Sequence, residues 1–317
     1  MDAELPFRLA GRRVFVAGHR GMTGAALVRR LAHEDCTILT APRDTLDLRE
    51  RAAVHAWMAR ERPDVVILAA ARVGGVFANA TRPVEFILDN LLIETSVLEA
   101  AYHTNVGKLL FLGSSCIYPR LAPQPIREEA LLTGSLEPTN EPYAIAKIAG
   151  LKLAQAFRRE YDRDFISAMP TNLFGPGDNY DPDGSHVLPA LIRKVAEAQA
   201  AGAPVTIWGS GTPRREFLYV DDCADACVHL LKHYSGELAL NVGTGQDLTI
   251  LELTRLVMRV LGYDGPIAHD LTKPDGTPRK LLDVSRLTAL GWTASTPLEG
   301  GIATAYADWH AGGGRNQ

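Results

Sequence analysis

The sequence predicts an α/β protein in which a Rossmann-type, doubly wound parallel sheet carries a smaller C-terminal substrate lobe. Three observations predict this fold. Short apolar runs alternate with helix-length segments through the first half of the chain, which is typical of right-handed βαβ units. Three glycines at positions 18, 21 and 24 follow the first apolar run. Beyond Pro170 the alternation gives way to a turn-rich segment.

The strands and helices of the sheet domain follow from local composition. Short runs rich in Val, Ile, Leu and Phe predict buried parallel strands, at 13–17, 37–40, 65–70, 108–112 and 165–169. The longer segments between them predict the covering helices, at 25–33, 52–60, 86–103 and 143–161.

The second half of the chain predicts a different arrangement. Residues 175–184 are rich in Gly, Pro, Asp and Asn and are too long for a tight connection. A helix at 188–201 and a strand at 205–208 follow, and 238–242 is expected to rejoin the main sheet. We therefore expect a Rossmann domain of residues 1–172, with 217–246 returning to it. The substrate-binding lobe is expected to combine 173–216 with 247–317.

Composition limits the function classes. The formal net charge of -4 in 317 residues argues against a nucleic-acid partner, which requires a basic face. No apolar run is long enough for a membrane span, and no signal-peptide pattern follows Met1. The four cysteines form no Cys-x-x-Cys pair, so we expect free thiols in the cytoplasm. His229 and His233 stand near Cys223 and Cys227 without a zinc-binding pattern, and we expect no metal.

The glycine turn at 18–24 predicts a dinucleotide site. Glycines permit a tight turn and let a pyrophosphate approach the free N–H groups at the start of a helix. Arg43 follows the end of the second strand, and its guanidinium suits a 2′-phosphate; Arg20 in the turn can reach the same group. The sequence therefore favours NADP, although Asp44 beside Arg43 leaves NAD open.

Tyr143 and Lys147 predict the chemistry. Their spacing of four residues puts both side chains on one helix face, where an ammonium is expected to lower the tyrosine pKa. Ser114 stands at the end of the fourth strand, the edge where open α/β sheets bind ligands. Together they predict a reductase in which Tyr143 transfers a proton, Ser114 hydrogen-bonds the reacting oxygen and Lys147 binds the nicotinamide ribose.

Cys116 and His186 are further candidates. In an extended segment Cys116 would share a side with Ser114, two residues earlier, although an isolated cysteine is more often a small buried apolar residue. His186, at the start of the second-lobe helix, can transfer protons near neutral pH, although a histidine in a loop is more often a surface residue.

Six strings of the sequence resemble the GDP-L-fucose synthase family, a group of extended short-chain dehydrogenases/reductases. They are Gly-His-Arg-Gly-Met-x-Gly at 18–24, Gly-Ser-Ser-Cys-Ile-Tyr-Pro at 113–119, Glu-Pro-Thr-Asn-Glu-Pro-Tyr-Ala-Ile-Ala-Lys at 137–147, Met-Pro-Thr-Asn-Leu-Phe-Gly-Pro at 169–176, Trp-Gly-Ser-Gly-Thr-Pro at 208–213 and Lys-Pro-Asp-Gly-Thr-Pro-Arg-Lys at 273–280. The resemblance spans roughly residues 11–310.

The resemblance implies an activity and a set of residues for it. The family epimerises GDP-4-keto-6-deoxy-D-mannose at C3 and C5 and reduces C4 with NADPH to give GDP-L-fucose, typically as a homodimer. Ser114, Tyr143 and Lys147 match its reductase residues, and Cys116 and His186 match its epimerisation pair, with no assignment of acid and base. The implied NADP contacts are Gly18, Arg20, Gly21, Met22, Thr23, Gly24, Arg43, Asp47, Leu48, Leu112, Gly113, Ser114, Ser115, Lys147, Pro170, Thr171, Asn172, Leu173 and His186.

The implied sugar-nucleotide contacts are Lys194, Trp208, Arg215, Asp275 and Arg279. Lys194 departs from the arginine of the family pattern, which keeps the charge and loses the planar fork. Two other hypotheses remain at this point. One is a reductase or 4-epimerase acting on another nucleotide sugar, with Cys116 structural. The other is a non-catalytic NADPH sensor, which would not need the Ser/Tyr/Lys set.

Overall fold

A six-stranded parallel sheet forms the centre of the protein. The computed structural model describes residues 7–314 except 183 and 274. The strand order is β2-β1-β3-β4-β5-β9, and every neighbouring pair is parallel. The strands are β1 (Arg13–Ala17), β2 (Thr37–Leu39), β3 (Val65–Leu68), β4 (Lys108–Leu112), β5 (Phe165–Pro170) and β9 (Leu240–Val242). The chain reverses its direction of travel across the sheet between β2 and β3, so the predicted doubly wound topology is confirmed.

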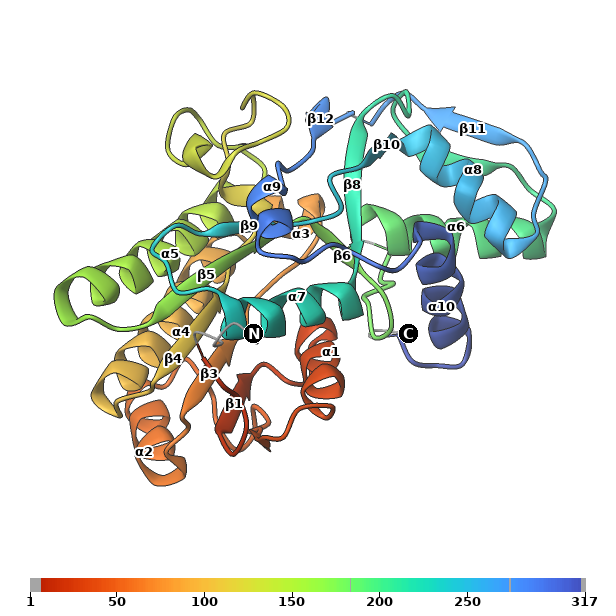
Figure 1. Cartoon of the computed structure of the whole chain (residues 1–317). Helices are drawn as coiled ribbons and strands as arrows, with labels where there is room; N and C mark the ends of the chain where they lie inside the picture. The colour runs from red at the N-terminus through yellow and green to blue at the C-terminus, as the bar shows by residue number, and fades with distance from the viewer. Residues whose placement is uncertain (1–6, 183, 274, 315–317) are drawn as a thin grey trace.

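Helices cover both faces of this sheet (Figure 1). On one face α1 (Met22–Leu31) packs against α7 (Val220–His233), over a core that includes Val14 and Val16 of β1. On the other face lie α2 (Arg51–Glu61), α4 (Pro83–His103) and α5 (Glu141–Tyr161), over a core that includes Phe15 and Ala17. Successive residues of β1 therefore point to opposite layers, and both layers exclude water from the sheet.

The second lobe has its own apolar core. It contains α6 (Val187–Ala201), α8 (Ile250–Leu261) and α10 (Leu298–His310), which lie apart from the sheet helices in Figure 1. Strand β7 (Val205–Trp208) pairs with β11 (Ile267–Asp270). A second small sheet has the order β10-β8-β12, with β6 also paired to β8. Its strands are β6 (Asn172–Phe174), β8 (Arg214–Tyr219), β10 (Asp247–Thr249) and β12 (Arg279–Lys280).

The predicted elements are present with shifted ends. Helices α1, α4 and α5 begin two or three residues before the predicted starts, at Met22, Pro83 and Glu141. Prolines in the first turns of α4 and α5 explain part of the error, because a first-turn residue needs no N–H partner. The strand expected at 238–242 forms as β9 and pairs with β5, so that expectation is confirmed.

Several elements were not predicted. Besides α7, α8, α10 and the strands of the second small sheet, they include β11, the short helices α3 (Val76–Thr81) and α9 (Ser285–Ala289), and the 3-10 turns η1 (Ser115–Ile117) and η2 (Glu128–Ala130).

Within the described part of the chain, no helix is long and apolar enough to cross a membrane. Among those same residues, no three His, Cys, Asp or Glu side chains gather as a metal site would require.

Candidate active site

The glycine turn lies between β1 and α1 and depends on glycine at two positions. Gly18 has φ +94°, and an added Cβ would lie 2.7 Å from Ala70 Cα at the end of the neighbouring strand. At Gly24 an added Cβ would lie 2.0 Å from the Gly18 carbonyl oxygen. Helix α1 therefore begins tightly against the turn, and its first turn carries no acidic residue that would repel an anion.

The carboxyl ends of β4 and β5 lie at the same edge of the sheet as this turn. Leu112 ends β4, and the Gly113 N–H donates to Ala168 of β5. Thr171, after β5, donates its N–H to Val242, and Asn172 donates from its side chain to the Glu216 carbonyl. The segments predicted to contact the cofactor are thus brought to one edge, where parallel sheets bind ligands.

Arg43 and Asp47 lie beyond the end of β2, and they differ in how firmly they are held. The Arg43 side chain is 69% exposed, with Nε 3.5 Å from Asp47 Oδ2. Asp47 is bound more closely by Arg49, at 2.7 Å, and this hydrogen bond holds the pKa of Asp47 at about 2. Arg43 is therefore the accessible cation here, and Asp47 acts first as a partner for arginines.

Ser114 and Tyr143 come together as predicted. Ser114 follows β4, and Tyr143 lies in the first turn of α5 with its ring 6.5 Å from that of Phe86. Burial raises the pKa of Tyr143, as do the charges of Cys116 and Glu94 when these are ionised, while a hydrogen bond with Ser114 acts in the opposite direction. The predicted lowering of this pKa by Lys147 is therefore wrong for this structure, because desolvation outweighs the favourable contacts.

The Lys147 side chain points toward α4 and the end of β4. Its Nζ lies 3.1 Å from Glu94 Oε1 of α4 and donates to the Leu112 carbonyl oxygen at 3.0 Å. The sequence reasoning missed Glu94. A charged residue inside the apolar stretch Leu91–Leu98 was the available signal, since such a residue is rarely buried unless it is paired.

Cys116 reaches the site by a different route from the one predicted. The chain leaves the extended conformation after Ser114 and forms η1, so the argument from strand alternation is wrong. Within this turn the Cys116 N–H donates to Ser114 Oγ at 3.2 Å. Two residues that the sequence reasoning missed approach its sulfur, Asn140 Nδ2 at 3.4 Å and Lys280 Nζ at 3.7 Å. Both belong to strings that carry the family resemblance, which was the signal for them.

A buried carboxylate places Lys280. Glu216 of β8 is fully buried and accepts hydrogen bonds from the N–H groups of Thr244, Gly245 and Leu282, at 2.7, 2.8 and 2.9 Å. Because Lys280 of β12 pairs with β8 and lies two residues before Leu282, this cluster fixes the approach of Lys280 to Cys116.

His186 is exposed and directly precedes α6. The segment before it packs against the start of α3, where the Gly75 N–H donates to the Gly184 carbonyl at 2.9 Å. A Cβ on Gly75 would lie 2.4 Å from the Ser185 carbonyl oxygen, so the close approach depends on glycine. The second lobe is thereby attached to the sheet domain two residues before His186.

The predicted sugar-nucleotide residues separate into two groups. At the end of β7, Trp208 is 52% exposed, and its ring lies 5.0 Å from Lys194 Nζ and 5.4 Å from Lys273 Nζ. Nearby, Asp275 accepts hydrogen bonds from the backbone and side chain of Ser210. The other two arginines are engaged within the lobe: Arg279 pairs with Asp247 at 2.5 Å, and Arg215 donates to the Arg214 carbonyl at 2.8 Å.

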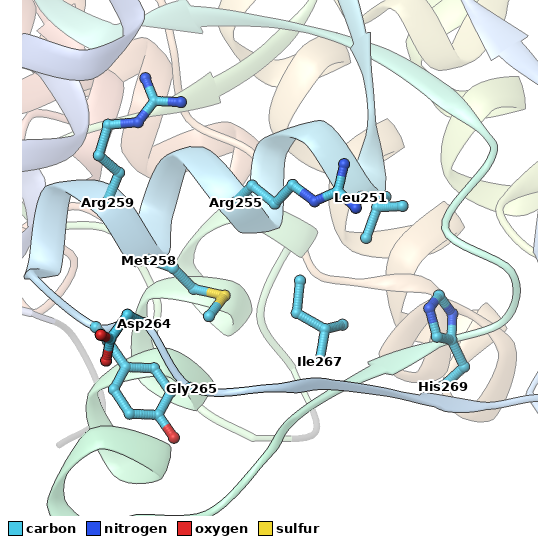
Figure 2. A pocket seen from close by; sticks show the side chains of 9 residues that line it. Leu251, Arg255, Met258, Arg259, Asp264, Gly265, Ile267 and His269 are labelled. Atoms are coloured by element: carbon cyan, nitrogen blue, oxygen red, sulfur yellow. The ribbon is translucent and has the colours of Figure 1, made fainter.

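A cavity of about 620 Å³ lies elsewhere, between α8 and β11. Figure 2 shows Met258 of the helix and Ile267 of the strand pointing into the space between them, whereas Arg259 points away. None of its lining residues is a predicted site residue, although His269 bonds the Gly209 carbonyl beside Trp208.

Comparison with known proteins places this geometry in a family. Residues 14–243 match the model of the NAD dependent epimerase/dehydratase family. The chain belongs to this family. It is 56% identical to GDP-L-fucose synthase of Sinorhizobium fredii, over 95% of this chain and 96% of the relative. Identity to GDP-L-fucose synthase of Escherichia coli K12 is 53%, over 94% and 96%.

A solved structure agrees with this grouping. The NADP-bound GDP-L-fucose synthetase of Naegleria fowleri superposes with a TM-score of 0.88 at 28% identity, covering 98% of this chain and 97% of that one. The resemblance drawn from the six sequence strings is therefore confirmed. The fold is the one that this solved structure has.

Proposed function

We propose that this protein converts GDP-4-keto-6-deoxy-D-mannose to GDP-L-fucose, as a 3,5-epimerase and an NADPH-dependent 4-reductase. The observation that carries the proposal is that the proposed reductase residues and the proposed epimerase thiol lie together at the end of β4. Ser114 contacts Tyr143, and the Cys116 N–H bonds the same Ser114 hydroxyl. A reductase pair and a thiol therefore share one oxygen-binding position, which a 4-keto sugar would fill. The names of the relatives support this substrate.

The chain's own residues perform the acid–base part of the reduction. NADPH supplies the hydride when it is bound. Tyr143 donates a proton to the oxygen at C4, and its raised pKa keeps the phenol protonated near neutral pH, which is the form that a ketone reduction needs. Ser114 donates a hydrogen bond to the same oxygen and orients the ketone toward Tyr143.

Epimerisation uses the acidity of the carbons beside the ketone. Removing a proton from C3 or C5 leaves an enolate, and returning a proton to the other face inverts the centre. Cys116 and His186 are proposed as the pair that transfers these protons. Lys280 and Asn140 support Cys116, because each brings an N–H to its sulfur. Reduction of the ketone then ends the acidity and preserves the new configuration.

We propose that the two lobes divide the binding. Residues 1–172 and 217–246 hold NADPH, with the start of α1 for the pyrophosphate and Arg43 and Arg20 for the 2′-phosphate. Residues 173–216 and 247–317 hold the sugar nucleotide, with Trp208 against a ring and Lys194 near the phosphates. Two ammonium groups, of half-buried Lys194 and exposed Lys273, lie near the Trp208 ring and support an anionic ligand there.

A homodimer in the cytoplasm is also proposed. Val84, Leu88 and Leu92 of α4 follow one another at every fourth position and are exposed, which makes an apolar stripe on one helix face. Helix α5, packed against α4, adds exposed Ile145. A second copy of the chain would cover this surface. A mass in solution equal to two chains would agree, and a monomer at all concentrations would contradict it.

Product identification tests the function directly. The purified protein is incubated with GDP-4-keto-6-deoxymannose and NADPH in deuterated water, and the product is analysed by mass and nuclear magnetic resonance. We expect GDP-L-fucose with deuterium at C3 and C5. A reduced product without inversion would favour the alternative, a reductase of another nucleotide sugar with a structural Cys116. Absence of NADPH oxidation would contradict both.

A further inference from the structure

Glu94 is a buried carboxylate that the proposed mechanism does not use. It lies within α4, its side chain is 1% exposed, and its Oε1 lies 3.1 Å from Lys147 Nζ, which is 2% exposed. Among the described residues this ammonium is the only charged group paired with it. Burial raises the pKa of Glu94, and Lys147 opposes that rise. A carboxylate in such a place is costly unless its partner holds it.

The surrounding structure makes room for this carboxylate. A Cβ on Gly150 would lie 2.4 Å from Glu94 Oε2 and 2.6 Å from the Phe111 ring. Glycine inside a helix is less favourable than alanine, so its presence within α5 reflects a packing need. Lys147 Nζ also lies 4.9 Å from the centre of the Phe111 ring and donates to Leu112 at the end of β4. The ammonium is thus held from three sides.

Stability alone does not explain the pair. Replacing a buried ion pair by apolar residues is often neutral or stabilising, so the pair is weak evidence for a structural role. Its location is informative, because Leu112 is the residue that leads into Ser114, at the ligand-binding edge of the sheet. The chain has a comparable pair at the opposite end of β4, where Lys108 Nζ lies 2.8 Å from Asp164 Oδ2.

We propose that Glu94 is a positioning residue for reduction, which fixes the Lys147 ammonium at the carboxyl end of β4, one helical turn from Tyr143. This inference rests on the proposed reductase function. No hydrogen bond joins Glu94 to Tyr143 in the described part of the chain, so Glu94 acts through its charge and through Lys147. It therefore differs from Ser114, Tyr143 and Lys147, which are expected to contact the substrate or the cofactor.

The expected change in the pKa of Tyr143 follows from the groups around its hydroxyl. These are Ser114 and Cys116 from the strand end and Glu94 from α4. Lys147 lies one turn further along α5 and pairs with Glu94, and Lys280 of β12 contacts Cys116. The Glu94 charge raises the pKa of Tyr143. Removing it lowers that pKa and frees the Lys147 ammonium to stabilise phenolate. The protonated phenol would then be lost at a lower pH.

The experiment compares Glu94→Gln and Glu94→Asp with the wild type. Glu94→Gln keeps the shape and removes the charge. We expect kcat for NADPH oxidation to fall about 10-fold or more at neutral pH, with KM for the sugar nearly unchanged. The alkaline decline of kcat should begin at lower pH, and Kd for NADPH should weaken by about 3- to 10-fold. Glu94→Asp should restore part of kcat and move the alkaline decline back.

Asp164→Asn is the matched control, because it removes a carboxylate from a buried lysine at the other end of the same strand. It should change thermal stability without changing the pH profile or Kd for NADPH. If Glu94→Gln folds poorly, Glu94→Asp tests the proposal by the same three measurements, which are kcat, the pH profile of kcat and Kd for NADPH. Unchanged kcat, pH profile and NADPH affinity in a folded Glu94 variant would overturn the proposal, as would equal changes in Asp164→Asn.

The two hypotheses fail in different ways. If the wild type does not turn over the GDP-sugar, the proposed function fails, while the NADPH Kd of the Glu94 variants still tests the placement of Lys147. If the wild type makes GDP-L-fucose and Glu94→Gln behaves like it, the function stands and the positioning role is wrong.

Discussion

Lys280 Nζ lies 3.7 Å from Cys116 Sγ, although the two residues are 164 positions apart in the chain. Cys116 follows the sheet domain's fourth strand, and Lys280 comes from the second lobe through β12. The contact joins the two lobes at the position where epimerisation is proposed. It also gives the thiol a cationic neighbour from the second lobe.

Cys116→Ser tests the epimerisation role. Serine keeps the shape and replaces the thiol by a far weaker acid, so proton removal at carbon should stop. We expect loss of solvent-deuterium incorporation at C3 and C5 and little GDP-L-fucose, while slow reduction of the unepimerised ketone to a D-series sugar continues. His186→Asn should also stop full epimerisation and leave exchange at one carbon. Normal deuterium uptake in Cys116→Ser would return this cysteine to a structural role.

Lys280→Met tests the neighbour of the thiol. It removes the cation and keeps an apolar stem, so deuterium exchange should slow by about 10-fold or more while Kd for NADPH stays within about 2-fold. Lys273→Met, in the same sequence string but beside Trp208, is the comparison and should instead raise KM for the sugar nucleotide. If both variants raised KM alone, Lys280 would be a substrate contact only.

Tyr143→Phe removes only the transferable proton and the hydroxyl that meets Ser114. NADPH should still bind with near-normal affinity, and hydride transfer should fall by about 100-fold or more, the usual scale for a general acid. Single-turnover NADPH oxidation, followed by absorbance, measures the step. Near-normal oxidation in this variant would refute the assignment of Tyr143 as the proton donor.

Arg43→Ala tests the cofactor preference. The guanidinium is exposed, is held only at 3.5 Å by Asp47 and stands where a 2′-phosphate is expected. Its loss should raise KM for NADPH by about 10- to 100-fold, equivalent to one or two charge-assisted hydrogen bonds, with little change for NADH. Arg43→Lys should recover part of the preference. Equal effects on the two cofactors would remove Arg43 from the phosphate site.

Two glycines on helices should respond oppositely to alanine. At Gly24 the new Cβ would overlap the Gly18 carbonyl at 2.0 Å, so Gly24→Ala should cost about 1–3 kcal/mol and weaken NADPH binding. At Gly300, inside α10, an added Cβ meets nothing within 4 Å, and Gly300→Ala should stabilise by about 0.5–1 kcal/mol. Urea unfolding measures both. Similar effects at the two positions would show that the packing argument is incorrect.

The sheet domain was predictable because its signals are local. Each strand is a short apolar run, and the glycine turn sits directly between one such run and a helix. The predicted starts of the helices were less accurate, as at α4 and α5. The N–H groups of first-turn residues have no hydrogen-bond partner within the helix, so they leave little local signal. The second lobe was poorly predicted. Its strands β6, β8, β10 and β12 are short and find their partners far along the chain.

The candidate site shows the same division. Ser114, Tyr143 and Lys147 could be named from spacing and from family strings, and the cysteine at 116 from its neighbour. The reason given for Cys116 was wrong, because η1 replaces the expected extended segment. The contacts of Glu94 with Lys147 and of Lys280 with Cys116 could not be predicted from sequence spacing. In each pair the two residues belong to different elements that are far apart in the sequence, so no local pattern indicates the contact.

The sequence by itself determined the parallel sheet, the family and the residue types of the chemistry. Hydrophobic periodicity, turn glycines and short motifs are properties of neighbouring residues and survive without the fold. Only the tertiary structure decided the electrostatic state of Tyr143 and the partners of Lys147 and Cys116. Desolvation and charge interactions depend on which groups meet in space, and here α4, α5 and β12 bring Glu94, Lys147 and Lys280 to one strand end.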